Sequence, residues 1–136
     1  MSTGNKAIVK RFYHEVVNQG NLALAAELMD YDYIEHGNQA ASGLEGFKQF
    51  VANLAGAFPD LQITIEDLIA EGDKVVARVT VQATHLGTFM GYIPPSGVEV
   101  TFTGIDIFQI KDGKIVGRWN HRDLLGLMQQ IGAVRL

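Results

Sequence analysis

The hydrophobic pattern of the chain changes its period near the middle, and this change most restricts the fold. In the first half, apolar residues such as Ile8, Phe12 and Val16 recur every three or four positions, which is typical of amphipathic helices. In the second half, apolar residues such as Leu61 and Ile63 alternate with polar ones, which is typical of half-buried strands. Helices followed by a run of strands predict an α+β fold, with N-terminal helices packed on a strongly curved, mostly antiparallel sheet.

Residues that begin or end helices divide the first half into segments. Gly20 predicts the end of the first helix, and a short second helix is expected after it. The segment 30–37 is expected to be irregular. Ser42 and Glu45 have the spacing of a capping box, which predicts a third helix that ends at Pro59.

Polar residues at alternate positions of the last strand give the strongest indication of chemistry. Trp119, His121 and Asp123 are two positions apart, so an unbulged strand places them on the face that also holds Ile115. The same parity places His85 on the apolar face of an earlier strand. Ionisable groups on an apolar face cost free energy unless they are paired or used in function. We therefore expect this face to carry a functional site.

A two-residue turn at 112–113 sets the expected register of the last hairpin. Without a bulge, Asp106 lies opposite Trp119, and Gly104 lies opposite His121. Asp106 and His121 are then diagonal neighbours within side-chain reach, and Gly104 leaves space beside them. Helices that cover such a concave face predict a pocket for a small apolar ligand, and its carboxylate and imidazole groups favour proton transfer.

The same residues also admit structural roles. His121 could be a buried histidine that is hydrogen-bonded to Asp106, and Asp123 could cap a helix that begins at Leu124. Tyr13, on the first helix, is of a type more often found in a core than in catalysis. The sequence alone leaves these alternatives open. Several ionisable residues on one otherwise apolar face nevertheless favour a functional site.

Size and charge exclude several classes of protein. A chain of 136 residues is expected to form one domain, 1–136, without room for a second. The net charge is −4 and the 11 basic residues are scattered, which argues against a surface for nucleic acid or for an anionic membrane. No apolar run approaches the length of a membrane span and no leader segment is visible, so a cytoplasmic protein is expected.

The residue types exclude several chemistries as well. There is no cysteine, which rules out disulfides, iron–sulfur clusters and thiolate zinc sites. The motif G-x-S-x-G and the glycine patterns that bind phosphate are absent. Histidines and carboxylates do not fall at the spacing of a metal-binding helix. A metal held by His36, His85 and His121 from separate elements stays open, but no local spacing supports it, so no metal is expected.

An ordered set of motifs extends along nearly the whole chain. The motifs are YIEHG (33–37), THLGTFMG (84–91), PPSG (94–97), GIDIF (104–108), DGKIV (112–116), WNHRD (119–123) and QQIG (129–132). Together they resemble the SnoaL-like polyketide cyclases, within the nuclear transport factor 2-like superfamily. The resemblance implies a cystatin-like, cone-shaped α+β barrel that assembles as a homodimer or homotetramer.

The resemblance also implies an activity. These cyclases close the last ring of an aromatic polyketide methyl ester by intramolecular aldol condensation, without metal or cofactor. The aspartate of their Trp-x-x-x-Asp motif is an acid and base, and this role carries over to Asp123. The expected catalytic residues are Asp123, His121 and Asp106. The expected residues for binding an aromatic or polyketide-like substrate are His36, His85, Trp119, Tyr13, Phe102 and Phe50.

Other functions remain open within the same superfamily. The WNHRD form of the motif is similar to relatives that hydroxylate anthracycline-type polyketides without a cofactor. Isomerases and dehydratases of this fold use comparable side chains. Epoxide hydrolases use an Asp-Arg-Asp set, but Arg78 and Arg122 are predicted on the outward face, which counts against that activity.

A non-catalytic binding or scaffolding domain is a further alternative, because a fold does not define a function. Val76, Ile105, Ile107 and Val116 are predicted on the convex face of the sheet. This apolar patch favours association between the sheets of two copies.

Overall fold

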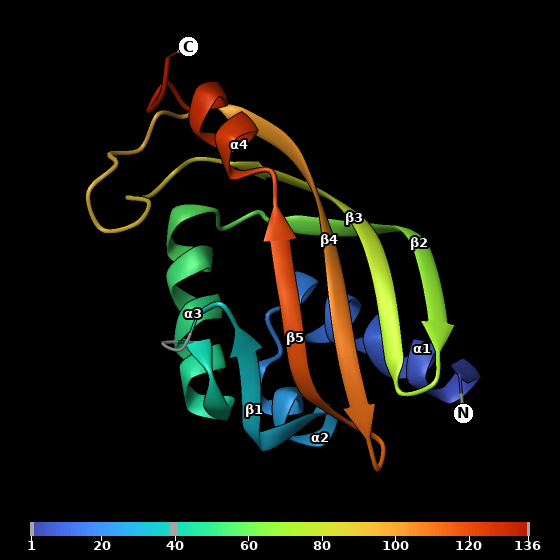
Figure 1. Cartoon of the computed structure of the whole chain (residues 1–136). Coiled ribbons are helices and arrows are strands. Elements are labelled where there is room, and N and C mark those ends of the chain that lie inside the picture. The colour runs from blue at the N-terminus through green and yellow to red at the C-terminus, as the bar shows by residue number, and fades with distance from the viewer. Residues whose placement is uncertain (1, 39–40, 136) are drawn as a thin grey trace.

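The chain forms a single five-stranded sheet that curls around a helical layer without closing into a barrel (Figure 1). The computed structural model describes residues 2–38 and 41–135. The strands are β1 (Met29–His36), β2 (Gln62–Glu71), β3 (Lys74–Thr84), β4 (Glu99–Lys111) and β5 (Lys114–Arg122), in the spatial order β1-β5-β4-β3-β2. All neighbouring strands are antiparallel except β1 and β5, which are parallel. The fold is therefore α+β, with helices packed on a curved, mostly antiparallel sheet, as predicted.

The helical layer consists of several short elements and one longer helix. They are α1 (Ser2–Arg11), the π-helix η1 (Phe12–Asn18), the 3-10 helix η2 (Leu22–Leu24), α2 (Ala25–Leu28), α3 (Gly43–Ala57) and α4 (Leu124–Gln130). Phe12 of η1 packs against Phe47 of α3 and Phe108 of β4, so the helices and the concave face of the sheet share one core. The same core includes Leu127 and Ile131, which places α4 over the end of that face.

Two local expectations change in the first half. The segment 30–37 was predicted to be irregular, but most of it belongs to the edge strand β1. Its partner β5 lies far along the chain, so no local pattern indicates the pairing. Helix α3 begins after Ser42 and ends before Pro59, as predicted, but the Ser42 side chain does not cap it. Ser42 Oγ instead accepts a hydrogen bond from Glu35 N at 2.9 Å, which ties the start of α3 to β1.

The inward faces of β3 and β4 agree with the predicted alternation. His85 follows β3 and is 0% exposed, like the apolar residues that share its face. Asp106 lies in the middle of β4 and is also 0% exposed. On the convex side, Ile105 is 49% exposed, while Val76, Ile107 and Val116 are half-buried. An apolar patch therefore exists on the convex face, and association through it stays a prediction.

The register of the last hairpin contains a β-bulge that the sequence analysis did not include. Ile110 pairs with Ile115, but the preceding Gln109 pairs with Gly117, so β5 contains one extra residue at this point. Such a residue reverses the side-chain parity of the strand that follows it. Beyond the bulge, Arg118 is turned into the concave face, where it is 4% exposed.

The prediction that Trp119, His121 and Asp123 share the apolar face was therefore wrong. Trp119 pairs with Ile107 on the convex side, and His121 is exposed there opposite Ile105. Arg122 was predicted to point outward, and this was also wrong.

The residues opposite the predicted site change accordingly. Asp106 lies opposite Asn120, and Gly104 lies opposite Arg122. The one-residue shift in register therefore changes which side chains of β5 face inward. The guanidinium groups of Arg118 and Arg122 face inward, in place of the predicted His121 and Asp123.

Candidate active site

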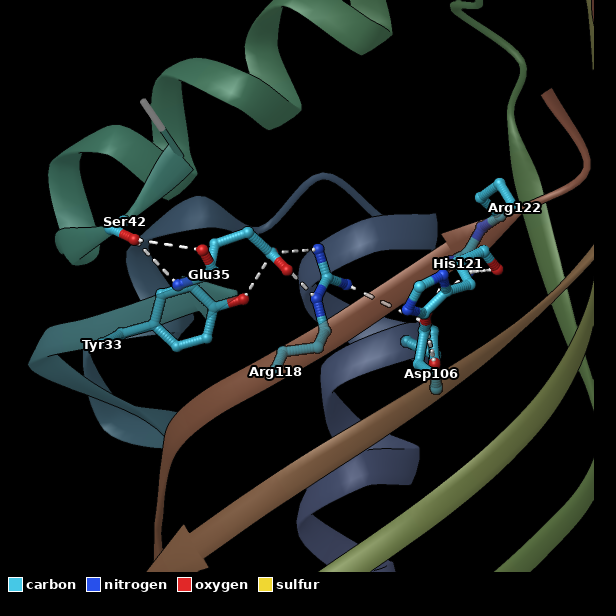
Figure 2. Close-up of polar contacts among 8 residues, drawn as sticks. Tyr33, Glu35, Ser42, Asp106, Arg118, His121 and Arg122 are labelled. Atoms are coloured by element: carbon cyan, nitrogen blue, oxygen red, sulfur yellow. Dashed lines mark hydrogen bonds and ion pairs between the residues drawn. The ribbon is translucent and has the colours of Figure 1, made fainter. Parts of the chain in front are cut away.

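The buried carboxylate of Asp106 is the centre of a polar cluster on the concave face (Figure 2). Arg122 donates from Nη1 to Oδ1 at 2.6 Å and from Nη2 to Oδ2 at 3.0 Å. The Tyr13 hydroxyl donates to Oδ2 at 2.5 Å. A buried carboxylate is strongly unfavourable unless it is paired and hydrogen-bonded, and this pairing explains why β4 accommodates an aspartate among apolar residues.

Gly104 is the residue that lets Arg122 reach Asp106. A Cβ atom at position 104 would lie 2.5 Å from the carbonyl oxygen of His121, 2.6 Å from Cδ of Arg122 and 2.7 Å from its Nη1. Side-chain carbons do not approach neighbours so closely. Gly104 was expected to leave space beside His121, but the side chain of Arg122 fills that space.

Tyr13 reaches the cluster from the π-helix η1. Its ring packs edge-on against Phe108, with 5.6 Å between the ring centroids, and is 0% exposed. Burial and, secondarily, the charge of Asp106 raise the pKa of Tyr13 well above its usual range. The phenol therefore stays protonated and acts as a hydrogen-bond donor. π-Helical turns are rare and are frequent at functional sites, which fits the position of this tyrosine.

A second buried cluster lies beside the first, where β1 pairs with β5. Glu35 is the register partner of Arg118. Arg118 donates from Nε and Nη2 to Oε1 of Glu35 at 3.0 and 2.8 Å, and the Tyr33 hydroxyl donates to the same oxygen at 2.6 Å. Burial raises the pKa of Tyr33 above its usual value, so this phenol is also a donor at neutral pH.

Arg118 is charged although it is buried. Burial alone would lower the pKa of the guanidinium, but Tyr33, Asp106 and Glu35 together raise it above its ordinary value. The cation also lies 5.4 Å from the ring centre of Phe12, within the range of a cation–π interaction.

Arg118 joins the two clusters into one row of alternating charge. Its Nη1 lies 4.0 Å from Oδ2 of Asp106, so the order is Glu35, Arg118, Asp106, Arg122. Figure 2 shows Arg118 between the two carboxylates. The side chains of the first three are between 0% and 5% exposed, whereas that of Arg122 is 12% exposed. The row is electrically balanced, and Arg122 is the member that approaches solvent.

Asp123 occupies the structural position that the sequence analysis left open. It is exposed at the N-terminus of α4, where its Oδ1 accepts a hydrogen bond from Gly126 N at 2.9 Å. Its backbone N donates to the carbonyl of Thr103, so the residue is fixed where β5 passes into α4. Asp123 directly follows Arg122 in the sequence, and its carboxylate lies against Gly126 at the exposed start of α4.

Two of the predicted substrate-binding residues lie away from the concave face. The rings of His36 and Trp119 stack on each other, with 4.0 Å between centroids and 4° between planes. They are register partners on β1 and β5, and their chain neighbours Glu35 and Arg118 point inward. His36 and Trp119 therefore lie on the convex side, together with His121.

The other predicted substrate-binding residues stay on the concave side or beside it. Phe102 is 8% exposed on the inward face of β4, and Phe50 is half-buried on α3. His85 is fully buried, and its Nδ1 accepts a hydrogen bond from Ser96 N at 3.2 Å. Nδ1 also lies 2.9 Å from Ser96 Oγ, whereas the buried Nε2 has no hydrogen-bond partner among residues 2–38 and 41–135.

The sequence patterns placed Asp106 and His85 on the buried face and singled out Tyr13, but they did not indicate the charged partners of Asp106. Glu35 was not a candidate because the segment 30–37 was expected to be irregular, and the two arginines were not candidates because the bulge reverses the parity of β5. One signal was present in the sequence. A mid-strand aspartate on an apolar face requires a cation nearby, and Arg118 and Arg122 are the two arginines of the neighbouring strand β5.

Neither a metal cluster nor a membrane span is found in the part of the chain that the structure describes. No three histidine or carboxylate side chains of that part lie close enough together to hold a metal ion. No helix of that part has the length and apolar character needed to cross a membrane.

Comparison with known proteins places the chain in a family. The model of the SnoaL-like polyketide cyclases matches residues 7–131, and the chain belongs to this family. Among curated proteins, no sequence match is found.

Solved structures agree with the family assignment. TsrD from Streptomyces laurentii is 32% identical, with a TM-score of 0.90 and 98% of each chain covered. A candidate SnoaL-like polyketide cyclase from Jannaschia sp. CCS1 is also 32% identical, with a TM-score of 0.88 and coverage of 98% of this chain and 95% of that one. AclR from Streptomyces galilaeus, described as a hydroxylase candidate, is 27% identical, with a TM-score of 0.86 and coverage of 99% of this chain and 100% of that one.

Proposed function

We propose that the protein is an enzyme of the polyketide cyclase type that closes a ring by intramolecular aldol condensation. The family assignment supports an enzyme of this type. The observation that carries the proposal is the buried Tyr13–Asp106–Arg122 cluster, which holds a guanidinium in one orientation at the end of an apolar concave face. A fixed cation at such a place stabilises an oxyanion that develops on a carbonyl substrate.

The proposed reaction moves one proton and forms one carbon–carbon bond. Asp123 removes a proton from the carbon next to an ester carbonyl, and Arg122 stabilises the enolate oxygen. The enolate carbon attacks an aldehyde within the same molecule, and Asp123 returns the proton to the alkoxide. The product therefore has the mass of the substrate.

The choice of Asp123 as the base rests on the Trp-x-x-x-Asp motif, which Trp119 and Asp123 match. Oδ1 of Asp123 is engaged by Gly126, while Oδ2 has no hydrogen bond to any residue of 2–38 or 41–135 and can accept a proton. Tyr13 and Asp106 are saturated by each other and by Arg122, so they position the guanidinium rather than transfer protons. His121 has no part in this scheme, because it lies on the convex face.

The test is turnover of an anthraquinone-type polyketide methyl ester, followed by mass spectrometry of the products. The wild type should give a product of unchanged mass at equal rates in air and under nitrogen. Asp123→Asn should lose at least about 100-fold in kcat, a typical contribution of a general acid–base group, while His121→Ala should keep its rate. Loss of activity in both variants, or in neither, would refute the assignment of Asp123.

Cofactor-free hydroxylation is a second candidate, and the similarity to AclR favours it. The same experiment separates the two functions. A product heavier by one oxygen atom that forms only in air would replace the cyclase with a hydroxylase. Absence of turnover by a folded wild type would favour another isomerase or dehydratase reaction, or a non-catalytic binding domain.

A further inference from the structure

The carboxylate of Glu35 does not contact Arg122, yet it belongs to the same row of charges. Glu35 lies on the edge strand β1 and is 5% exposed. Three donors from Tyr33 and Arg118 converge on its Oε1. Its Oε2 is buried and has no hydrogen-bond partner among the described residues. A buried carboxylate with a purely structural role usually has both oxygens satisfied, so this one-sided arrangement requires a reason.

The arrangement fixes the direction of Arg118. Because Nε and Nη2 are both held by one oxygen of Glu35, the remaining Nη1 is directed toward Asp106. The distance of 4.0 Å from Nη1 to Oδ2 of Asp106 is too long for a hydrogen bond, but the charges still attract each other. Glu35 therefore holds Arg118 just outside the hydrogen-bonding shell of Asp106.

Both oxygens of Asp106 are already in use. Arg122 occupies Oδ1 and shares Oδ2 with the Tyr13 hydroxyl. If Glu35 lost its charge, Asp106 would become the nearest carboxylate to Arg118. A shift of about 1 Å would bring Nη1 into hydrogen-bond range of Oδ2. Arg118 would then compete with Arg122 and Tyr13 for that oxygen.

We propose that Glu35 is a positioning residue of the Asp106–Arg122 centre and that it acts through Arg118. By holding Arg118 away, Glu35 leaves Asp106 to Arg122 and so fixes the guanidinium that faces the substrate. The inference rests on the proposed function for its kinetic test, but its structural test does not need turnover.

The structural test measures the Nε–H signal of Arg122 by NMR in 15N-arginine-labelled protein, assigned with an Arg122→Gln sample. Glu35→Gln removes the charge, and its Arg122 signal should shift and broaden. Tyr33→Phe is the matched control, because it removes a donor from the same Oε1 while the charge remains. Its Arg122 signal should match the wild type. An unchanged signal in Glu35→Gln, or equal shifts in the two variants, would overturn the proposal.

A double variant keeps the proposal testable if Glu35→Gln folds poorly because Arg118 loses its partner. Glu35→Gln combined with Arg118→Gln removes both charges and leaves Asp106 paired with Arg122. If Glu35 acts only through Arg118, then Glu35→Gln has no further effect on the Arg122 signal when Arg118→Gln is already present. A further shift in that background would show that Glu35 acts by another route and would overturn the proposal.

The kinetic test uses the same variants and the substrate given above. Glu35→Gln should lower kcat by about 10- to 100-fold with little change in KM, since a misplaced catalytic group has effects of this size. Tyr33→Phe should stay within about threefold of the wild type, and Glu35→Asp, which keeps the charge, should recover part of the loss. A wild-type rate in folded Glu35→Gln would overturn the proposal. If the wild type itself shows no turnover, the proposed function fails, and the NMR comparison alone decides the role of Glu35.

Discussion

Replacing Asp106 by asparagine tests whether the buried charge pair holds the fold together as the geometry indicates. The substitution keeps the shape of the side chain, so it creates no cavity. It removes the negative charge. With the amide oxygen in the place of Oδ2, the 3.0 Å hydrogen bond from Arg122 Nη2 remains, but the 2.6 Å bond from Nη1 is lost and an amide NH2 group faces the guanidinium instead. Arg122 is only 12% exposed and cannot recover its full hydration without moving.

The expected loss of stability follows from these contacts. Hydrogen bonds to charged groups contribute about 1.5–3 kcal/mol each, and breaking a buried ion pair costs about 3–5 kcal/mol. The Tyr13 hydroxyl can still donate to the amide oxygen, which limits the loss. We expect Asp106→Asn to lower the free energy of unfolding by about 3–4 kcal/mol, which leaves most single domains folded.

Asp67→Asn is a matched control for this prediction. Asp67 also accepts from an arginine at 2.6 Å, in this case Arg78 Nε, but the two side chains are 55% and 53% exposed. An exposed pair contributes at most about 1 kcal/mol. The two ion pairs have the same shortest N–O distance of 2.6 Å but differ in burial. The difference in unfolding free energy between the two variants therefore measures the effect of burial.

The assay is urea unfolding followed by the fluorescence of Trp119, which is the only tryptophan of the chain. Two protein concentrations would reveal any contribution from association. A second variant that combines Asp106→Asn with Arg122→Met should be less destabilised than the sum of its single changes, since the two residues interact directly. If Asp106→Asn costs no more than Asp67→Asn, the pair does not stabilise the core, and the reasoning is refuted.

Two further predictions concern the tyrosines and the glycine of the site. Because burial raises the folded-state pKa of Tyr13 and Tyr33, their contribution to stability is fully present below about pH 10 and decreases above it, where the unfolded chain ionises first. Alkaline unfolding followed by circular dichroism should therefore begin above about pH 10 and move to higher pH in Tyr13→Phe, and an unchanged midpoint would contradict the burial of this phenol. Gly104→Ala should destabilise the protein by about 1–3 kcal/mol in urea unfolding and perturb the Nε–H signal of Arg122, because the added methyl group overlaps that side chain. If Gly104→Ala has the urea midpoint and the NMR spectrum of the wild type, the side chain of Arg122 does not lie against position 104.

The sequence predicts much of this fold because local patterns control it. The alternation along β3 and β4 correctly placed His85 and Asp106 on the inward face, and the Ser42 and Pro59 signals bounded α3. The turn at Asp112 also forms as expected, with a positive φ at that residue. These features depend on neighbouring residues and on hydrophobic period alone.

The rest of the site depends on interactions that no local pattern contains. One extra residue after Ile115 reverses β5, and parity gives no sign of it. The reversed strand places Arg118 and Arg122 against Glu35 and Asp106, which come from two other strands. Charge compensation does predict inward-facing arginines, because Asp106 would otherwise be buried without a cation.

The bulge in β5 also limits the insertions and deletions that this chain can accept during evolution. Surface hairpins usually tolerate insertions and deletions, since their loops lie in solvent. Here, loss of one residue such as Val116 would turn the rest of β5 over, so that Trp119 and His121 enter the interior and both arginines leave it. A gene that encodes this chain can therefore vary the composition of the last hairpin more freely than its length.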